Sequence, residues 1–297
     1  MRLMLRWRLS LGTLLIAAMV GLCWLDHCAA EPGVWLLPVA AVLTVLASGE
    51  VLHLAASAGM RPVAWVVYAG NLLLLAANWA PHWCGDKAQG GAFLQPSNCL
   101  LLALGAGVLL AFVGEMARYR RPEGVLANLA AAVFALAYVG LMFGFLVQLR
   151  LGWGIGALAS LVIVVKMGDT GAYTVGRLVG RHKMAPVLSP GKTIEGACGA
   201  MAFAALASWA TFEWLVPLTV AAGTPTVEWR QSVLYGLLVG GAGMFGDLAE
   251  SLLKRAAGCK DSSRWMPGFG GVLDILDSVL LAAPVAWACW AWGLLAK

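Results

Sequence analysis

The stretch that decides the fold covers residues 246–278 and reads GDLAESLLKRAAGCKDSSRWMPGFGGVLDILDS. In its first part, polar side chains recur at i, i+3, i+4 and i+7, so a helix would carry them all on one face. They are Asp247, Glu250, Ser251 and Lys254. After a basic, glycine-rich turn, the next apolar segment opens with a similar spacing in Asp274, Asp277 and Ser278. The sequence therefore predicts two helix ends that present carboxylates toward one place.

The composition around this stretch is that of a membrane protein, and a membrane makes carboxylates expensive. Of the 297 residues, 61% are hydrophobic and only 12% are charged, whereas soluble domains are about 45–50% apolar and about 25% charged. A carboxylate near the bilayer centre costs at least about 2.5 kcal/mol, so it usually marks an ion or substrate site. We expect these carboxylates to bind Mg²⁺.

Apolar stretches of about 17–25 residues recur along the chain, and each is long enough for a helix to cross the hydrocarbon layer. We predict an all-α integral membrane protein with about nine transmembrane helices. The predicted spans are about 9–25, 34–57, 63–80, 99–117, 124–147, 152–168, 197–222, 231–250 and 276–295.

The basic residues indicate the orientation of these spans. With a cytoplasmic N-terminus, only four of the 20 Lys and Arg residues fall outside, namely Lys87, Arg150, Arg230 and Lys297. The positive-inside rule favours this orientation, which places the carboxylates at the cytoplasmic face. The net charge of +5 is spread over short loops beside the spans. It therefore indicates anionic lipid or phosphate partners rather than nucleic acid.

The N-terminal segment and the cysteines each leave two interpretations. Three arginines, an apolar run and Cys28-Ala29-Ala30 resemble a signal peptide with a cleavage site, but we interpret the segment as an uncleaved first helix. The seven cysteines lack metal-binding spacing, which argues against zinc. Cys84 and Cys99 flank the external loop 81–98, where they are either unpaired or joined by a disulfide.

The first half of the chain holds few informative polar groups. Glu50 with His53, and Glu115 near Arg118, lie at or near predicted cytoplasmic helix ends. We interpret both as satisfied interfacial pairs, with a substrate contact as the alternative.

A first polar loop is predicted at 168–196, with Asp169 at the end of the sixth span. It reads GDTGAYTVGRLVGRHKMAPVLSPGKTIEG. Its segment Ser189–Thr193 places backbone donors, hydroxyls and Lys192 near the start of a helix, a combination that suits a polyphosphate. The GxxxxGK[ST] spacing of a P-loop is absent. The basic residues alone would also fit the positive-inside rule.

The second polar loop is predicted at 251–275, within the opening stretch. It adds Lys254, Arg255, Lys260 and Arg264 as cations, and the acidic residues around it are Asp247, Asp261, Asp274 and Asp277. Mg²⁺ takes carboxylates, waters and substrate phosphates together, so this mixture suits a nucleoside triphosphate site. The glycine-rich run 267–271 would let the backbone approach a ligand closely.

These two loops resemble the phosphatidate cytidylyltransferase (CDP-diacylglycerol synthase) family. The C-terminal residues that match its motif are Ser251, Lys254, Arg255, Lys260, Asp261, Pro267, Gly268, Gly270, Gly271, Asp274 and Asp277. The upstream matches are Asp169 to Tyr173, Gly176-Arg177, Ser189-Pro190, Lys192-Thr193 and Glu195-Gly196. The resemblance covers roughly 160–297, and the first half matches only as membrane helices.

Two positions depart from the family motif. Phe269 stands where the family has His, and Ile275 stands where it has Arg. Phenylalanine supplies neither the hydrogen bonds nor the proton of an imidazole, and isoleucine removes a permanent cation beside the carboxylates. Both departures affect the expected function more than the fold.

The resemblance implies transfer of CMP from CTP to phosphatidic acid, with CDP-diacylglycerol and pyrophosphate as products. It also implies one or two Mg²⁺ ions and a homodimer in the inner membrane. Together with the predicted spans, it gives five helices in residues 1–150 and a catalytic region in 151–297, with the active site on the cytoplasmic side that the positive-inside rule favours. Acyl-chain preference stays open.

The roles that we expect from it fall into three groups. The metal ligands are Asp247, Asp274 and Asp277. The catalytic residues are Lys254, Arg255, Lys260, Asp261 and Asp277. The substrate-binding residues are Asp169, Tyr173, Ser189, Lys192, Thr193, Glu195, Ser251, Gly270 and Gly271.

Two alternatives remain, of which one is another enzyme and the other belongs to a different functional class. A related CTP-dependent lipid kinase would use the same cations and Mg²⁺ to move a terminal phosphoryl group. A cation-coupled transporter or a non-catalytic relative would fit the residues at 269 and 275. A pyrophosphate product would exclude the kinase, and CTP turnover would exclude the transporter.

Overall fold

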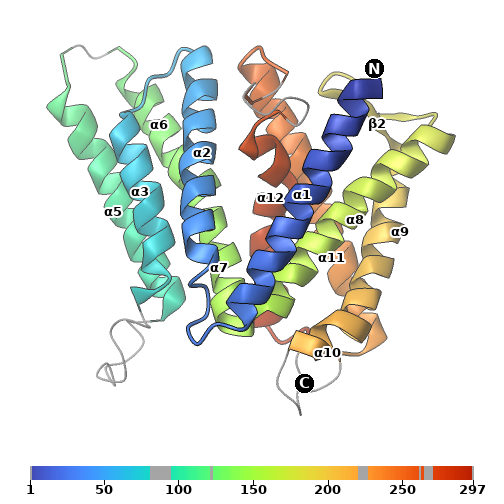
Figure 1. Ribbon diagram of the computed structural model, residues 1–297. Helices are drawn as coiled ribbons and strands as arrows, with labels where there is room; N and C mark the ends of the chain where they lie inside the picture. The colour runs from blue at the N-terminus through green and yellow to red at the C-terminus, as the bar shows by residue number, and fades with distance from the viewer. Residues whose placement is uncertain are drawn as a thin grey trace. The chain divides into compact units, whose positions relative to one another are not determined.

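Helices dominate the computed structural model, which describes residues 2–80, 95–120, 123–219, 227–260, 262–263 and 270–295 (Figure 1). The helices are α1 (Arg2–His27), α2 (Leu36–Ser57), α3 (Ala64–Ala77), α5 (Pro96–Ala117), α6 (Val125–Ala135), α7 (Met142–Trp153), α8 (Ile155–Val179), α9 (Ile194–Ala210), α10 (Val216–Thr219), α11 (Trp229–Ala256) and α12 (Val272–Ala291). Two π-helical turns join α6 to α7 and α9 to α10, namely η2 (Leu136–Leu141) and η3 (Thr211–Leu215).

Seven helical runs in the described part of the chain are long and apolar enough to cross a membrane. They are α2, α5, the continuous run Val125–Trp153, α8, the continuous run Ile194–Thr219, α11 and α12. Two shorter apolar helices, Gly12–His27 and Ala64–Ala77, occupy the other two predicted positions. The predicted class of helical membrane protein is confirmed, while the number of nine spans stays a prediction.

The chain divides into two compact units. Unit 1 contains residues 1–18, 34–148 and 256–275, and unit 2 contains residues 19–33, 149–255 and 276–297. Each unit combines N-terminal and C-terminal segments of the chain, and the division into 1–150 and 151–297 stays a prediction.

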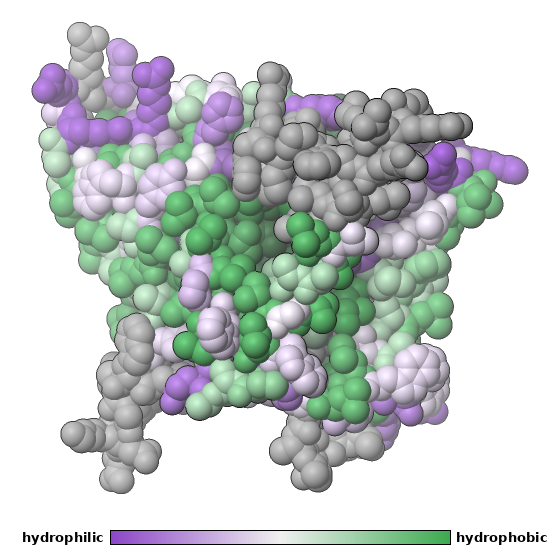
Figure 2. All heavy atoms as spheres, viewed as in Figure 1, coloured by the Kyte–Doolittle hydropathy of each residue, from purple (hydrophilic) through white to green (hydrophobic). Residues whose placement is uncertain are grey.

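In unit 1, α3 packs against α2, α5 and η2. Leu74, Leu100 and Leu136 form a buried cluster where these helices meet. The side-chain oxygen of Asn71 accepts a hydrogen bond from the Gly140 backbone in η2, and its NH₂ group donates to Ser48 Oγ. Such bonds satisfy polar groups that lipid cannot satisfy. Figure 2 shows apolar side chains over the helices of this unit and polar ones at one end.

In unit 2, the most extensive packing is between α8 and α9. Small residues allow this close approach, as in other membrane helix pairs. A Cβ at Gly171 would lie 2.6 Å from the Gly199 carbonyl oxygen, and a Cβ at Gly199 would lie 2.5 Å from the Val175 Cβ. A Cβ at Gly246 on α11 would lie 2.7 Å from the carbonyl oxygen of Asp277 on α12. Glycine therefore sets the separation of both helix pairs.

The boundary predicted at 168 is wrong, because α8 continues to Val179. The glycines that indicated a loop are packing positions: Gly171 approaches α9, and a Cβ at Gly176 would lie 3.1 Å from Thr193 Oγ1. The hydroxyls of Thr170 and Thr174 donate to carbonyl oxygens one turn earlier in α8. Asp169 and Tyr173 are consequently helical residues.

The connection after α8 is shorter than predicted and contains a β-hairpin. Strand β1 (Lys183–Ala185) pairs antiparallel with β2 (Ser189–Thr193), so the fold is not purely α. The second predicted loop, 251–275, is also shorter, because α11 extends to Ala256 and α12 begins at Val272. Polar side chains at helix ends had been interpreted as loop residues in both places.

Candidate active site

Unit 2 contains a cavity of about 400 Å³ between α8, α9, α11 and the hairpin. Its apolar lining includes Val165, Ala200 and Met244. Its polar lining consists of predicted site residues, namely Asp169, Tyr173, Ser189, Lys192, Thr193 and Asp247. The structure thus brings the upstream motif and the start of the C-terminal motif to one cavity.

An ion pair joins these two motifs inside the cavity. Lys192 Nζ on β2 lies 2.7 Å from Asp247 Oδ2 on α11, and the lysine side chain is 19% exposed. A second pair, Lys166 Nζ with Asp169 Oδ2 at 3.1 Å, lies within α8. The negative charge of Asp247 repels the carboxylates of both Asp169 and Asp277. Three carboxyl groups and two lysines therefore form one electrostatic cluster.

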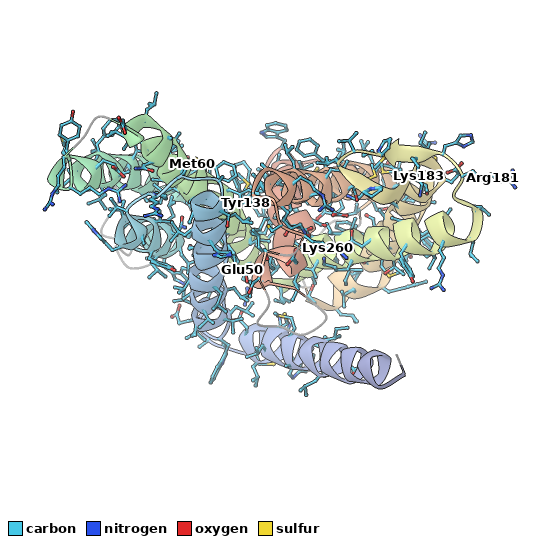
Figure 3. All side chains as sticks on the ribbon, turned by 90° about the horizontal axis from the view of Figure 1, so that it is seen from above. Glu50, Met60, Tyr138, Arg181, Lys183 and Lys260 are labelled. Carbon is cyan, nitrogen blue, oxygen red and sulfur yellow. The ribbon has the colours of Figure 1, made fainter. Side chains whose placement is uncertain are left out.

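The hairpin is fixed to α9 by residues that were predicted to bind substrate. Thr193 is the N-cap of α9, and its Oγ1 accepts a hydrogen bond of 3.1 Å from the Gly196 backbone. Glu195 accepts from the backbone N–H groups of Arg181 and His182, and its Oε1 lies 2.6 Å from His182 Nδ1. Figure 3 shows Arg181 and Lys183 at the outer end of this hairpin. Both acceptors thus hold the loop that carries Lys192.

The end of α11 carries two predicted catalytic cations, and both contact the protein itself. Lys254 Nζ lies 2.5 Å from Glu250 Oε2, a carboxylate that is fully buried. Arg255 Nε donates to the Leu188 carbonyl oxygen in the hairpin turn at 3.4 Å. Ser251 lies about one turn earlier on α11 and is half-buried. Their catalytic roles stay predictions.

The carboxyl group of Asp277 lies in the second turn of α12. Its Oδ1 accepts hydrogen bonds from the backbone and the hydroxyl of Ser278, at 2.5 and 3.0 Å. The close approach at Gly246 brings this part of α12 beside the start of the polar face on α11. This explains why Asp277 and Asp247 are electrostatic neighbours.

In unit 1, the first turn of α12 is organised by two carboxylates. Asp274 Oδ2 accepts hydrogen bonds from the backbones of Ser262 and Gly271, at 3.0 and 2.7 Å. Glu50 on α2 accepts from the backbones of Val272 and Leu273, at 2.9 and 2.8 Å. The two groups that approach Gly270 and Gly271 are therefore carboxylates of the chain itself.

Glu50 is the site residue that sequence reasoning missed. The expected interfacial pair with His53 gave the Glu50 carboxylate only a partner on its own helix. Figure 3 shows Glu50 on the flank of α2 that faces the C-terminal segment carrying Lys260, which is exposed. The available signal was the cost of a carboxylate within an apolar helix, which is usually offset by a specific partner. The parallel interpretation of Glu115 is confirmed, since its Oε1 lies 2.5 Å from Arg118 Nη2.

Asp261, Phe269 and Cys84 lie outside the described residues. The role of Asp261, the effect of the departure at 269 and a Cys84–Cys99 disulfide therefore stay predictions. Ile275 is helical and half-buried in the first turn of α12.

The donor set of the cavity suits Mg²⁺. Within the described ranges, no three His, Cys, Asp or Glu side chains are gathered closely enough to hold an ion by themselves. Mg²⁺ seldom needs such a cage, because it takes one or two carboxylates and fills its octahedron with waters and substrate phosphates. Asp247 in the cavity lining and its electrostatic neighbour Asp277 offer hard oxygens of this kind.

Comparison with known proteins gives the family. The family model described as "Cytidylyltransferase family" matches residues 6–292. The chain belongs to this family. It is 31% identical to a phosphatidate cytidylyltransferase of Mycobacterium bovis over 94% of this chain and 84% of the relative. The Mycobacterium tuberculosis protein of the same name is also 31% identical, over 94% and 79%. The Staphylococcus aureus protein of that name is 38% identical, over 52% of this chain and 56% of the relative.

Proposed function

We propose that the protein is a phosphatidate cytidylyltransferase, which transfers CMP from CTP to phosphatidic acid and releases pyrophosphate. The family match over nearly the whole chain and the names of its relatives support this activity. The observation that carries it in the structure is the Lys192–Asp247 ion pair inside the cavity. It joins a phosphate-binding cation to a metal-binding carboxylate.

The ion pair gives the cavity a way to accept a magnesium–triphosphate complex. Before binding, Lys192 and Asp247 balance each other's charge. When the complex binds, Asp247 turns to the metal and Lys192 turns to the phosphates, so neither charge is left uncompensated in a partly buried place. Ser189 and the start of α9 supply further donors to phosphate oxygens.

The metal would be held by Asp247, Asp274 and Asp277, with a second ion as an open part of the proposal. Mg²⁺ would neutralise the triphosphate and the departing pyrophosphate. Lys254, Arg255, Lys260 and Asp261 would orient phosphates or the nucleotide. Thr193 and Glu195 would act on the substrate through the loop that they hold. The buried Glu250 holds Lys254 in place.

The reaction exchanges one phosphorus–oxygen bond for another. A phosphate oxygen of phosphatidic acid forms a bond to the α-phosphorus of CTP, and the bond from that phosphorus to the oxygen that bridges to the β-phosphorus breaks. Pyrophosphate leaves with the bonding electrons. Catalysis then consists mainly of positioning and charge stabilisation, because the protein forms no covalent intermediate.

The membrane setting follows from the two substrates. CTP dissolves in water and phosphatidic acid in the leaflet, so the site belongs at headgroup level. The distribution of Lys and Arg supports a cytoplasmic N-terminus and an active site on the cytoplasmic face of the inner membrane. Family resemblance supports a homodimer.

The test uses purified protein in detergent, dioleoyl phosphatidic acid, Mg²⁺ and CTP labelled either at the α- or at the γ-phosphate. The proposal requires α-label in the organic phase, γ-label in pyrophosphate, and a much lower rate of transfer in Asp247→Asn at the same Mg²⁺ concentration. Transfer of γ-label to lipid would replace it with the lipid kinase. Absence of CTP turnover in folded protein would contradict both and favour the transporter or non-catalytic relative.

A further inference from the structure

Glu50 lies in the half of the chain in which the sequence showed no family motif, yet it contacts the C-terminal motif. It is 6% exposed on α2. Its Oε1 accepts from Val272 N–H, and its Oε2 from Leu273 N–H. The Ser262 hydroxyl lies 2.8 Å from Glu50 Oε2 and equally close to Asp274 Oδ2. One carboxylate therefore contacts both ends of the segment between Ser262 and α12.

The start of α12 needs an acceptor from elsewhere. The first N–H groups of a helix have no partner inside it, and a side chain at the N-cap normally supplies one. Here the N-cap residue is Gly271, which has no side chain. Asp274, three residues later, accepts from the Gly271 N–H, as the second half of a capping box does. The next two N–H groups are those that Glu50 accepts.

The absence of a side chain at Gly271 is itself explained by Glu50. A Cβ there would overlap the Ser262 hydroxyl and both carboxylate oxygens of Glu50. Gly270 adopts φ +82°, and a Cβ on it would overlap the Asp274 carboxylate. Because Gly270 and Gly271 lack side chains, the carboxylates of Glu50 and Asp274 can approach the start of α12. Their negative charge is also favourable at the positive end of the helix dipole.

We infer that Glu50 is a positioning residue for the transfer reaction, which acts by fixing the first turn of α12. This inference rests on the proposed function, because Asp274 is one of its metal ligands and Asp277 lies one turn further along α12. Glu50 touches neither CTP nor lipid in this role. It holds the backbone from which Asp274 projects, so its loss lowers the turnover number and weakens Mg²⁺ binding without removing a ligand.

The central variant is Glu50→Gln, which keeps the size of the side chain but removes the charge and turns an acceptor into a donor. The matched control is Glu115→Gln, because Glu115 is equally buried in the same unit and pairs with Arg118 rather than with α12. We expect kcat to fall about 10–100-fold in Glu50→Gln, the range seen for groups that orient metal ligands. The KM for phosphatidic acid stays unchanged, and the Mg²⁺ concentration for half-maximal rate rises.

A readout independent of activity is amide hydrogen exchange of the peptide covering 270–275. Glu50→Gln should speed its exchange at least about tenfold relative to wild type, while peptides from α5 and α8 keep theirs. Glu50→Asp keeps the charge on a shorter side chain and should recover part of both effects. Gly271→Ala keeps Glu50 but displaces its carboxylate, and it should reproduce Glu50→Gln. It also serves if Glu50→Gln fails to fold.

Equal behaviour of Glu50→Gln and Glu115→Gln in kcat and in exchange at 270–275 would overturn the inference. So would faster exchange throughout the protein, which would indicate a general loss of stability. If wild-type protein transfers no CMP, the proposed function fails instead, and the exchange experiment still decides whether Glu50 fixes the start of α12.

Discussion

Lys192 and Asp247 are 55 residues apart in the sequence and lie 2.7 Å apart in the structure, which ties the hairpin to α11. The Asp247 side chain is 40% exposed, whereas Lys192 Nζ is buried, so a ligand would reach the pair from the side of the carboxylate. The ion pair therefore places a cation and a carboxylate side by side, and each of them can exchange its partner for a ligand. This relationship makes the cavity suitable for an anion that arrives with a metal ion.

Replacement of Lys192 by Gln should impair the use of CTP selectively. It removes a charge-assisted contact to phosphate, so kcat/KM for CTP should fall about 100-fold, which corresponds to about 2.7 kcal/mol. The KM for phosphatidic acid should hardly change. Steady-state kinetics with each substrate varied in turn measures this. Lys183→Gln, on the exposed strand β1, is the control, and an equal loss in both variants would contradict a specific role for Lys192.

Magnesium removal should stop transfer reversibly. Addition of EDTA in excess should abolish release of pyrophosphate, and Mg²⁺ should restore it. In Asp247→Asn, the Mg²⁺ concentration for half-maximal rate should rise by more than about tenfold, since a neutral amide oxygen is a weaker ligand for a hard cation. A titration of pyrophosphate release against Mg²⁺ measures both effects. Glu123→Gln, an exposed acid in unit 1, should leave the titration unchanged.

Replacement of Gly246 by Ala should separate α11 from α12. The added methyl group would lie 2.7 Å from the Asp277 carbonyl oxygen, which is backbone and has no alternative rotamer. We expect destabilisation by about 1–3 kcal/mol and loss of activity. Gly241→Ala on the same helix is the matched control, because its nearest neighbour would be the end of the Met201 side chain at 3.7 Å. There, the higher helix propensity of Ala should stabilise the protein slightly. Thermal unfolding in detergent compares them.

Replacement of Asp26 by Asn should destabilise unit 2 strongly. Asp26 is fully buried, its Oδ2 lies 2.6 Å from Arg150 Nε, and it also accepts from the Gly33 backbone. Loss of its charge leaves Arg150 buried without compensation, which costs about 3–5 kcal/mol. Denaturant unfolding measures the loss, with the exposed Glu31→Gln as a control that should change stability by less than about 0.5 kcal/mol. Similar unfolding of both variants would show that the pair contributes little.

The pattern of apolar and charged residues predicted the fold class, because the hydrocarbon layer fixes helix length and composition. It could not predict where α8 ends. The glycines between Asp169 and Arg177 occur equally in loops and in tightly packed helices, and only the partner helix α9 decides between the two. The hairpin was missed for a related reason, since its short strands lie within a run that loop-forming residues dominate.

Within the candidate site, spacing along a helix predicted that the carboxylates of α11 and α12 would face one place, and residue chemistry selected Lys192 as a phosphate-binding residue. The contribution of Glu50 could not be read in this way. Its partners are backbone N–H groups, which every residue possesses and which leave no trace in the side chains. The signal lay in the partner of Glu50, because α12 starts after a glycine, which has no side chain to cap the helix.

The cap of α12 also bears on how the chain is made. Glu50 and the Val272 N–H that it accepts are separated by 222 residues, so α12 cannot complete its first turn until α2 has been inserted and packed. α12 leaves the ribosome long after α2, and a contact of such long sequence separation forms late. A nascent chain in the membrane therefore lacks the turn from which Asp274 projects until both helices have been made.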